Sequence, residues 1–202
     1  FFFHAEAAIR DAQESRGLGD VYKRQVHDMP ILDIGWYYGL VAGIAGLLGT
    51  LFGGWSADYM VRKTKNRNWY IWIPFVSTII AIPFALNTFL LMPDGYITVY
   101  SYFIPTFFGG WYLAPCLAAN HFLVGIRMRA MASAFLLFVL NLIGLGFGPM
   151  LTGFVSDFLT PEFGNNGLRY ALSITILINV WCAFHYYCCL KTITKDFDRA
   201  PA

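Results

Sequence analysis

The sequence predicts an all-α integral membrane protein with five transmembrane helices. Only 13% of its 202 residues are charged and 57% are hydrophobic, whereas about 25% of the residues of a soluble domain are charged. Five charge-free stretches each reach the roughly 20 residues that a helix needs to cross a hydrocarbon core of ~30 Å. We expect the five helices at residues 34–57, 69–92, 97–125, 130–156 and 170–190.

The basic residues predict how these helices are oriented. Nine Lys and Arg side chains follow the first, third and fifth helices, whereas the connections on the other side carry only Arg169. Cytoplasmic loops collect Lys and Arg, so we expect the basic connections and a tail at 191–202 to lie in the cytoplasm. The expected location is the cell membrane, a bacterial inner membrane, which the chain crosses several times. A soluble helical bundle would not sort its basic residues in this way. The nine residues are Arg62, Lys63, Lys65, Arg67, Arg127, Arg129, Lys191, Lys195 and Arg199.

The first predicted helix carries a stripe of glycine residues. Six of them recur every three or four positions, close to the 3.6-residue helical period, and they fall inside an arc of about 120°. In lipid, small residues mark faces where two helix backbones approach closely. The stripe therefore predicts a contact face, used either for tight packing in a static bundle or for sliding of another helix. Its members are Gly35, Gly39, Gly43, Gly46, Gly49 and Gly53.

The fourth predicted helix repeats this pattern. Five of its residues share one side, spread over about 80°. Pro149 follows the last of them, and a membrane helix tolerates a proline only where neighbours or cavity water satisfy the freed carbonyl. The pattern favours a second helix contact face in a protein that moves. The five residues are Ala130, Ala134, Asn141, Gly144 and Gly148.

The second and third predicted helices contain further interruptions. Four prolines and one glycine pair lie inside them, and such interrupted helices are typical of moving proteins whose helices line a cavity. The interruptions are Pro74, Pro83, Pro105, Pro115 and Gly109-Gly110.

The beginning of the chain does not fit the membrane pattern. Residues 1–25 carry eight charges, show no apolar helical face and lack a signal-peptide pattern. The string RDAQESRGLGDVYKRQ, residues 10–25, closely resembles a translated sequencing-adapter read-through, so we expect residues 1–25 to be foreign to the protein; a genuine disordered tail is the alternative. Since the first residue is Phe1, we expect a fragment whose genuine part begins with an extracellular loop remnant at 26–33.

The residues after the first glycine stripe form a recognisable motif. The string GWSADYMVRK, residues 54–63, resembles the G-x-L-A-D-R-x-G-R-K signature of the major facilitator superfamily, in the copy that joins transmembrane helices 8 and 9. In that family the aspartate accepts charge-assisted hydrogen bonds from basic residues and from a helix N-terminus of the opposite half, which latches the cytoplasmic side shut. An ordinary membrane-edge loop is the alternative. Gly54, Ala57, Asp58, Arg62 and Lys63 match the signature; Ser56, Tyr59 and Val61 depart from it.

Further segments extend the resemblance to the spinster-like branch of this superfamily. They lie at residues 109–115, 127–134, 141–149 and 156–157. The resemblance implies a C-terminal half, helices 8 to 12 of a twelve-helix fold, with the N-terminal half and helix 7 missing. It also implies that helices 8 and 11 face the opposite half. The two small-residue stripes fall on these two helices, so Gly144, Gly148, Pro149 and the six glycines of the first helix are expected to pack between the halves.

The resemblance implies a secondary transporter that moves a small organic solute by alternating access. Spinster-like members are linked to lipids, lysolipids, sugar acids and other organic anions, often with proton coupling. The expected partners are therefore the lipid bilayer, the missing half and such a solute, with no nucleic acid and no cofactor. Between residues 34 and 190 no charged residue lies at membrane depth, so a coupling acid would have to lie in the missing half.

Four polar or aromatic residues are candidates for the lining of a solute cavity. They are Asn141, Trp111, Tyr112 and Asn120. Asn141 is preferred because it shares the small-residue face of the fourth helix, although a hydrogen bond between helices is an equal alternative. His121 and His185 are the only titratable candidates, for a pH-sensing or a packing role.

The sequence offers no catalytic or metal-binding pattern. Its four cysteines lack the Cys-x2-Cys spacing of zinc sites, and no hydrolase or phosphate-loop signature is present. We therefore expect no enzyme, no metal and no catalytic residue. A transporter fragment is the favoured class. A membrane-embedded enzyme would need convergent polar or metal-binding residues on facing helices, and the sequence has only scattered Asn and His. A membrane interaction protein or remnant without transport of its own is the alternative.

Overall fold

A computed structural model of the protein describes residues 34–91 and 95–200. The segment 1–25, predicted to be foreign, and the predicted loop 26–33 lie outside the described residues. Within the described ranges every regular element is a helix, which confirms the predicted all-α class. Four of these helices are long and apolar enough to cross a membrane, at residues 35–64, 69–90, 126–163 and 167–199.

The first predicted helix is present and longer than predicted. It begins as a π-helical turn, Ile34–Tyr38, and continues as α4, Gly39–Thr64. Lys65 ends it in the left-handed conformation, with φ 56°, and its N–H bonds back to a carbonyl of the last turn. The prediction ended this helix before its first charged side chain, Asp58, because it was based on hydropathy. Backbone hydrogen bonds do not depend on side-chain charge, so the helix continues to its cap at Lys65.

The second helix, α5, covers Trp69–Leu90 with Pro74 and Pro83 inside it. Its end is capped from another helix. The Arg169 side chain donates from Nε to the carbonyl of Phe89 over 2.8 Å and from Nη2 to the carbonyl of Leu90. The last carbonyls of a helix have no partner inside it and carry partial negative charge. A guanidinium therefore stabilises them both by donating hydrogen bonds and by its positive charge.

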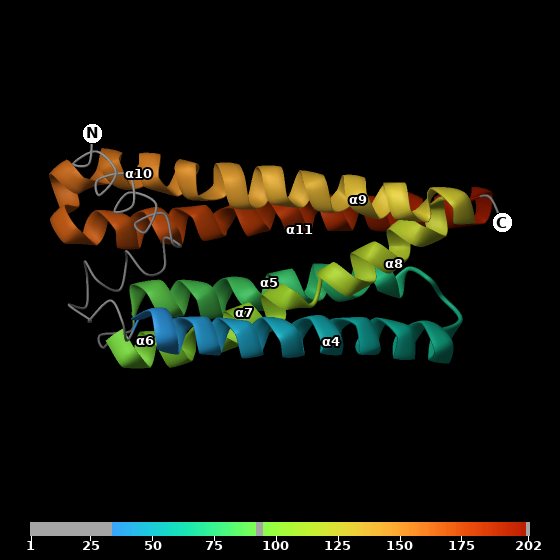
Figure 1. Ribbon diagram of the computed structural model, residues 1–202, viewed down its shortest axis with the longest axis horizontal. Helices are drawn as coiled ribbons and strands as arrows, with labels where there is room; N and C mark the ends of the chain where they lie inside the picture. Colours follow the sequence, from blue (N-terminus) through green and yellow to red (C-terminus); the bar gives the residue numbers. More distant parts are fainter. Residues whose placement is uncertain (1–33, 92–94, 201–202) are drawn as a thin grey trace, which may run out of the picture.

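The prediction of one continuous helix over residues 97–125 is wrong. The chain forms three shorter helices instead: α6, Gly95–Ser101, α7, Phe103–Gly110, and α8, Leu113–Leu123. The breaks lie three or four residues before Pro105 and Pro115. A proline has no N–H for the carbonyl four residues earlier, and its ring pushes against that turn. Together the three helices still run along the whole length of the bundle (Figure 1).

The fourth stretch is a long run of helix, from Ile126 to Phe163, with a change of hydrogen-bond pattern in the middle. It consists of a 3-10 turn at Ile126–Met128, α9, Arg129–Val139, a π-helix at Leu140–Phe147 and α10, Gly148–Phe163. An i+4 pattern would match the carbonyl of Leu145 with Pro149, which lacks an N–H. A shift to i+5 matches it with the next residue, which has one, and so the π-helix accommodates the proline.

The fifth helix extends well past the predicted membrane boundary. After a 3-10 turn at Gly164–Asn166, α11 runs over Gly167–Arg199. Most of the predicted tail 191–202 is therefore helical. Its Ile193 and Phe197 are buried, 4% and 6% exposed, because they lie one helical turn apart and pack on the ends of α5 and α8.

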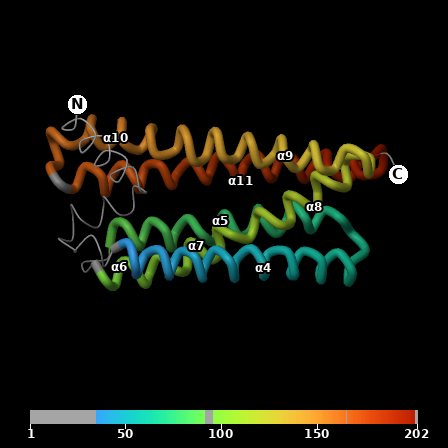
Figure 2. Tube along the Cα trace, in the orientation of Figure 1, coloured from blue at the N-terminus to red at the C-terminus, as the bar shows by residue number. Residues whose placement is uncertain are grey.

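The helices form two groups along one long axis (Figure 1). In one group, α5 packs against α4 and α7; in the other, α10 packs against α11. Contacts between α5 and α11 join the groups. Figure 2 shows α8 crossing from beside α4 to α9, at the end where the C-terminus lies. Most of the described buried apolar residues form three small clusters. Many large apolar side chains point outward, as expected where lipid covers a protein.

Candidate functional site

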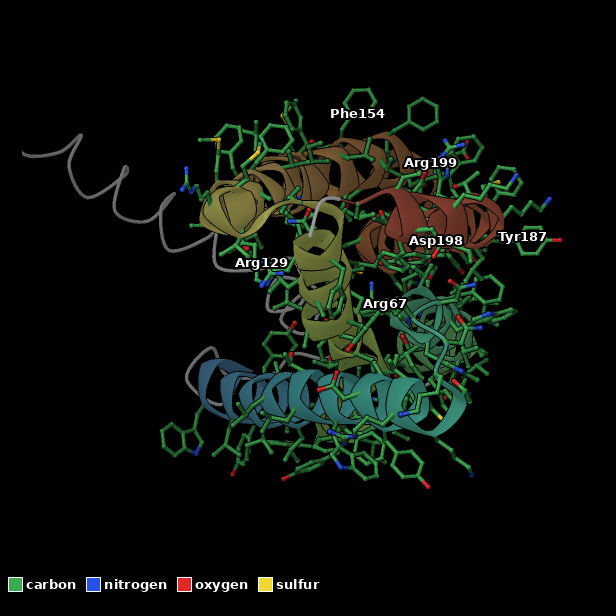
Figure 3. The ribbon with its side chains drawn as sticks, turned by 90° about the vertical axis from the view of Figure 1, so that its right-hand side faces the viewer. Arg67, Arg129, Phe154, Tyr187, Asp198 and Arg199 are labelled. Atoms are coloured by element: carbon green, nitrogen blue, oxygen red, sulfur yellow. The ribbon has the colours of Figure 1, made fainter. Side chains whose placement is uncertain are left out.

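The basic residues that set the predicted orientation gather at one end of the bundle. The ends of α4 and α11, the start of α5 and the junction of α8 with α9 all lie there (Figure 1). Figure 3 looks onto this end, with Arg67 and Arg129 on either side of α8 and Arg199 at the end of α11. The guanidinium carbon of Arg67 lies 5.0 Å from the ring centre of Phe122. This end holds the predicted latch motif.

Asp58 of the latch motif has a different partner from the one expected. Its Oδ1 accepts a hydrogen bond of 2.8 Å from the hydroxyl of Tyr70 on α5. Among the described residues, no ion pair joins Asp58 to Arg62 or Lys63, so the expected local pairs are not formed in this structure. The Lys63 ammonium instead lies 5.9 Å from the ring centre of Tyr59.

Gly54 of the motif allows a close contact between two helices. A Cβ atom at this position would lie 3.1 Å from Cβ of Ala114 on α8, closer than ordinary contact. The next helical turn contributes Ala57, which is fully buried. The small residues of the motif therefore have a packing role within this chain, while its charged residues are exposed.

The glycine stripe of α4 divides into two parts. Added Cβ atoms at Gly49 and Gly53 would lie 2.1 Å from the carbonyl oxygen of Phe107 and 2.5 Å from Cα of Trp111. The expectation that all six glycines pack between halves therefore needs correction: these two pack on α7 and on the turn that follows it in the same chain. At the other four, Gly35, Gly39, Gly43 and Gly46, an added Cβ would meet nothing within 4 Å.

The small-residue face of the fourth helix is open. Added Cβ atoms at Gly144 and Gly148 would meet nothing within 4 Å, and Pro149 is exposed. Asn141, on the same face, is also exposed and donates from Nδ2 to the carbonyl of Leu137 in its own helix over 2.7 Å. Figure 3 shows Phe154 of α10 pointing away from the bundle.

The other three cavity candidates lie on the broken third stretch, inside the bundle. The indole N–H of Trp111 and the amide nitrogen of Asn120 are buried and have no hydrogen-bond partner among the described residues. The Trp111 ring packs on Phe52, with ring centres 5.0 Å apart. Tyr112 is half-buried. Buried donors without partners are costly, so these two nitrogens are suited to a ligand that offers hydrogen-bond acceptors.

The remaining polar candidates form contacts between helices. An imidazole nitrogen of His121 is hydrogen-bonded to the hydroxyl of Ser133 and so joins α8 to α9. The Cys116 thiol lies 3.7 Å from the hydroxyl of Tyr186 on α11. His185 is exposed and pairs with the carbonyl of Trp181, one turn earlier in its own helix. Among the residues that the structure describes, no group of three His, Cys, Asp or Glu side chains could hold a metal ion.

Two residues of this arrangement were not singled out from the sequence. Tyr70 lies twelve positions after Asp58, and the spacing of two antiparallel helices joined by a short loop brings such positions together.

Arg169 was counted only as a charge in the sequence, yet it caps α5. Arg169 is the one basic residue in the predicted connections opposite the basic end, and this isolation was the available signal that it has a specific structural role.

Comparisons with known proteins agree with the described fold. No family model matches the chain. A protein of Mycolicibacterium smegmatis described as an MFS-type efflux pump is 33% identical over 148 residues, which are 73% of this chain and 34% of that protein. The crystal structure of a bacterial homologue of the human lysosomal transporter Spinster, inward-facing and unoccupied, matches with a TM-score of 0.76 and 23% identity, over 90% of this chain and 47% of the other. The chain thus spans about a third of the first protein and about half of the second.

Proposed function

Because this chain is a portion of a major facilitator superfamily fold of the spinster-like type, we propose that it is part of a secondary transporter that moves a small organic solute across a membrane. The chain supplies helices 8 to 12, and helix 7 and the N-terminal half supply the rest of the solute path. The two halves rock about a site near the middle of the membrane and open it to one side at a time.

One observation carries this proposal: the most apolar part of the helical run from Ile126 to Phe163 is uncovered, although α10 packs on α11. In its most apolar window, none of the residues is buried within the described chain. Gly144 and Gly148 leave open space along it, and a glycine face gains nothing from lipid contact but allows a second helix backbone to approach closely. An added Cβ also meets nothing within 4 Å at Gly35 of the π-helical turn and at Gly39, Gly43 and Gly46 of α4. Together these positions fit the opposite half of a transporter.

The basic end is proposed to face the cytoplasm and to open and close during transport. Asp58 is exposed there, and beyond Tyr70 no partner holds it within the described residues. A helix N-terminus of the opposite half would supply N–H donors and positive potential to this carboxylate. Arg62 and Lys63 add positive charge on the same helix end. The contact would stabilise the state in which the cytoplasmic side is closed.

The solute is proposed to bind beside the broken third stretch. Trp111 and Asn120 direct unpartnered, buried N–H groups into the interior, so the preferred solute carries hydrogen-bond acceptors, as organic anions and lipid-like headgroups do. Tyr112 follows Trp111 in the chain. Asn141 lines the face of the fourth helix that the solute passes.

Uptake into liposomes tests the proposal. The complete protein is purified and reconstituted, and counterflow is measured with radiolabelled gluconate, with lysophosphatidylcholine and with ethidium. Exchange of at least one probe is expected. Gly144→Leu should abolish exchange at unchanged membrane abundance. An added Cβ meets nothing within 4 Å in this chain, and the proposal places a helix of the opposite half against this position. If the wild type exchanges a probe and Gly144→Leu exchanges it equally well, the proposed packing is contradicted. If no probe is exchanged, transport of these solute classes is contradicted.

Substitution of Asn120 tests the solute site. Asn120→Ala removes a buried donor without a partner and is expected to raise KM for the transported probe. Asn179→Ala is the matched control, since Asn179 is exposed on α11 and bonds only the carbonyl of Ile176 in its own helix over 3.1 Å. An equal KM in both variants would remove Asn120 from the site.

A further inference from the structure

The ring of Tyr70 is held in a buried cluster, while its hydroxyl reaches a charged residue. Tyr70 is 7% exposed and packs with Ala57 of α4 and with Ile193 and Phe197 of α11. Its ring centre lies 5.4 Å from that of Phe122 on α8. Residues of three other helices therefore surround this side chain, and its hydroxyl donates to Asp58 Oδ1 over 2.8 Å.

The backbone at Tyr70 is fixed as well. The N–H of Tyr70 bonds to the carbonyl of Arg67 over 3.1 Å. The Asn68 side chain pairs with the hydroxyl of Thr194 on α11, with distances of 2.7 and 3.1 Å. Since the start of α5 is tied to α11 and the ring is enclosed, the Tyr70 hydroxyl cannot follow Asp58 if the end of α4 moves.

The hydrogen bond leaves half of the Asp58 carboxylate available. An ionised carboxylate has two acceptor oxygens, and Oδ2 accepts no hydrogen bond from the residues that the structure describes. Asp58 is exposed, and a side chain in solvent would otherwise sample several rotamers. The bond from Tyr70 restricts this choice and keeps the carboxylate away from Arg62 and Lys63, four and five positions further along α4.

We propose that Tyr70 is a positioning residue for Asp58: it fixes the carboxylate at the basic end so that its second oxygen is presented to a donor outside this chain. The proposal rests on the proposed function, in which Asp58 closes the cytoplasmic side. Tyr70 acts only through Asp58, so its hydroxyl has no effect once the carboxylate is absent.

A thermodynamic cycle with an accessibility readout tests this role. In the complete protein, with its native cysteines replaced, Ala130→Cys places a thiol at the exposed start of α9, beside the proposed opening. The rate of its reaction with a membrane-impermeant maleimide, added from the basic end, reports how often that side is open. This rate is measured for the parent, Tyr70→Phe, Asp58→Ala and the double variant.

Tyr70→Phe keeps the ring and removes only the donor. It is expected to change the labelling rate about fivefold or more, the lower range of coupling between linked sites, and to lower the transport rate more than it raises KM. In the Asp58→Ala background it should change labelling by less than about twofold, the scatter of uncoupled sites. Replacement of Tyr70 by 4-aminophenylalanine, which restores an N–H donor at the same place, should restore the parental rate.

A matched control separates the hydroxyl from general aromatic packing. Tyr59→Phe removes a hydroxyl next to Asp58 on an exposed ring that has no hydrogen bond among the described residues, and it should label like the parent. Equal effects of Tyr70→Phe with and without Asp58, or failure of the 4-amino variant to rescue, would overturn the inference in favour of a packing role. Labelling needs no transported solute, so a protein that shows the cycle but exchanges no probe would contradict the proposed function and leave the role of Tyr70 supported.

Discussion

Gly49→Ala should show how closely α4 and α7 approach each other. An added Cβ would lie 2.1 Å from the carbonyl oxygen of Phe107 and 3.0 Å from its carbonyl carbon, whereas ordinary contact begins at 3.4 Å. The obstacle is backbone, which no rotamer change removes, so the two helices must separate by about 1.3 Å, the difference between 3.4 and 2.1 Å. This separation would weaken the ring contact between Phe52 and Phe107, whose centres lie 6.0 Å apart.

The expected loss is about 3 kcal/mol, the upper range for one extra methyl group in a packed interior. The gain in helix propensity of Ala over Gly, about 0.5–1 kcal/mol, offsets part of it. A net loss of roughly 2 kcal/mol lowers the ratio of folded to unfolded protein about 30-fold. Gly53→Ala should behave similarly, because its Cβ would lie 2.5 Å from the Trp111 backbone.

Gly43→Ala is the matched control on the same helix. Its Cβ meets nothing within 4 Å, so only the gain in propensity remains and the chain should be unchanged or stabilised by up to about 1 kcal/mol. The assay is unfolding of residues 34–200 in one detergent, followed by the loss of helical circular dichroism. Equal midpoints for Gly43→Ala and Gly49→Ala would refute the close approach of α4 and α7.

Three further predictions concern the ends of the bundle. Under the proposed function, Asp58→Asn in the complete protein should shift the balance between open and closed states by a coupling of about 1–3 kcal/mol and impair transport at matched abundance. Equal transport rates would show that Asp58 is only a membrane-edge residue. A cysteine introduced at Lys65 should react only with reagent added from the cytoplasm and one at Asn165 only from outside, and the reverse result would overturn the orientation. Arg169→Gln should cost about 1–3 kcal/mol of unfolding free energy, since it removes charged hydrogen bonds to the last carbonyls of α5; an unchanged unfolding midpoint would count against the cap.

The sequence determined the membrane class of this protein and the approximate place of its helical stretches, because both follow from composition along the chain. A charge-free stretch of 20 or more residues has few alternatives to a helix in lipid, where every backbone group needs a partner. Basic residues at alternate connections implied one charged end, and the structure brings them together at one end. The motif around Asp58 supported a family resemblance with which the described fold and its structural neighbour agree.

Only the tertiary structure decided where the third stretch breaks and which helices the small residues contact. Hydropathy sums side chains and does not register a lost backbone hydrogen bond, so the third stretch was expected as one helix although Pro105 and Pro115 break it. The glycine stripe indicated that another helix approaches closely, but not which one, because a small-residue face looks the same in the sequence whichever helix packs on it. In the structure, Gly49 and Gly53 contact the backbone of Phe107 on α7 and of Trp111.

The partner of Asp58 was decided in the same way. Charge alone favoured Arg62 and Lys63, which lie on the next turn of its own helix. The hydroxyl of Tyr70 is the observed partner because residues of α8 and α11 enclose its ring and hold the hydroxyl at hydrogen-bond distance from the carboxylate. A donor already fixed in place loses less entropy on forming the bond than a long, flexible basic side chain does. Packing between distant segments, which no local pattern encodes, set the geometry of the candidate latch.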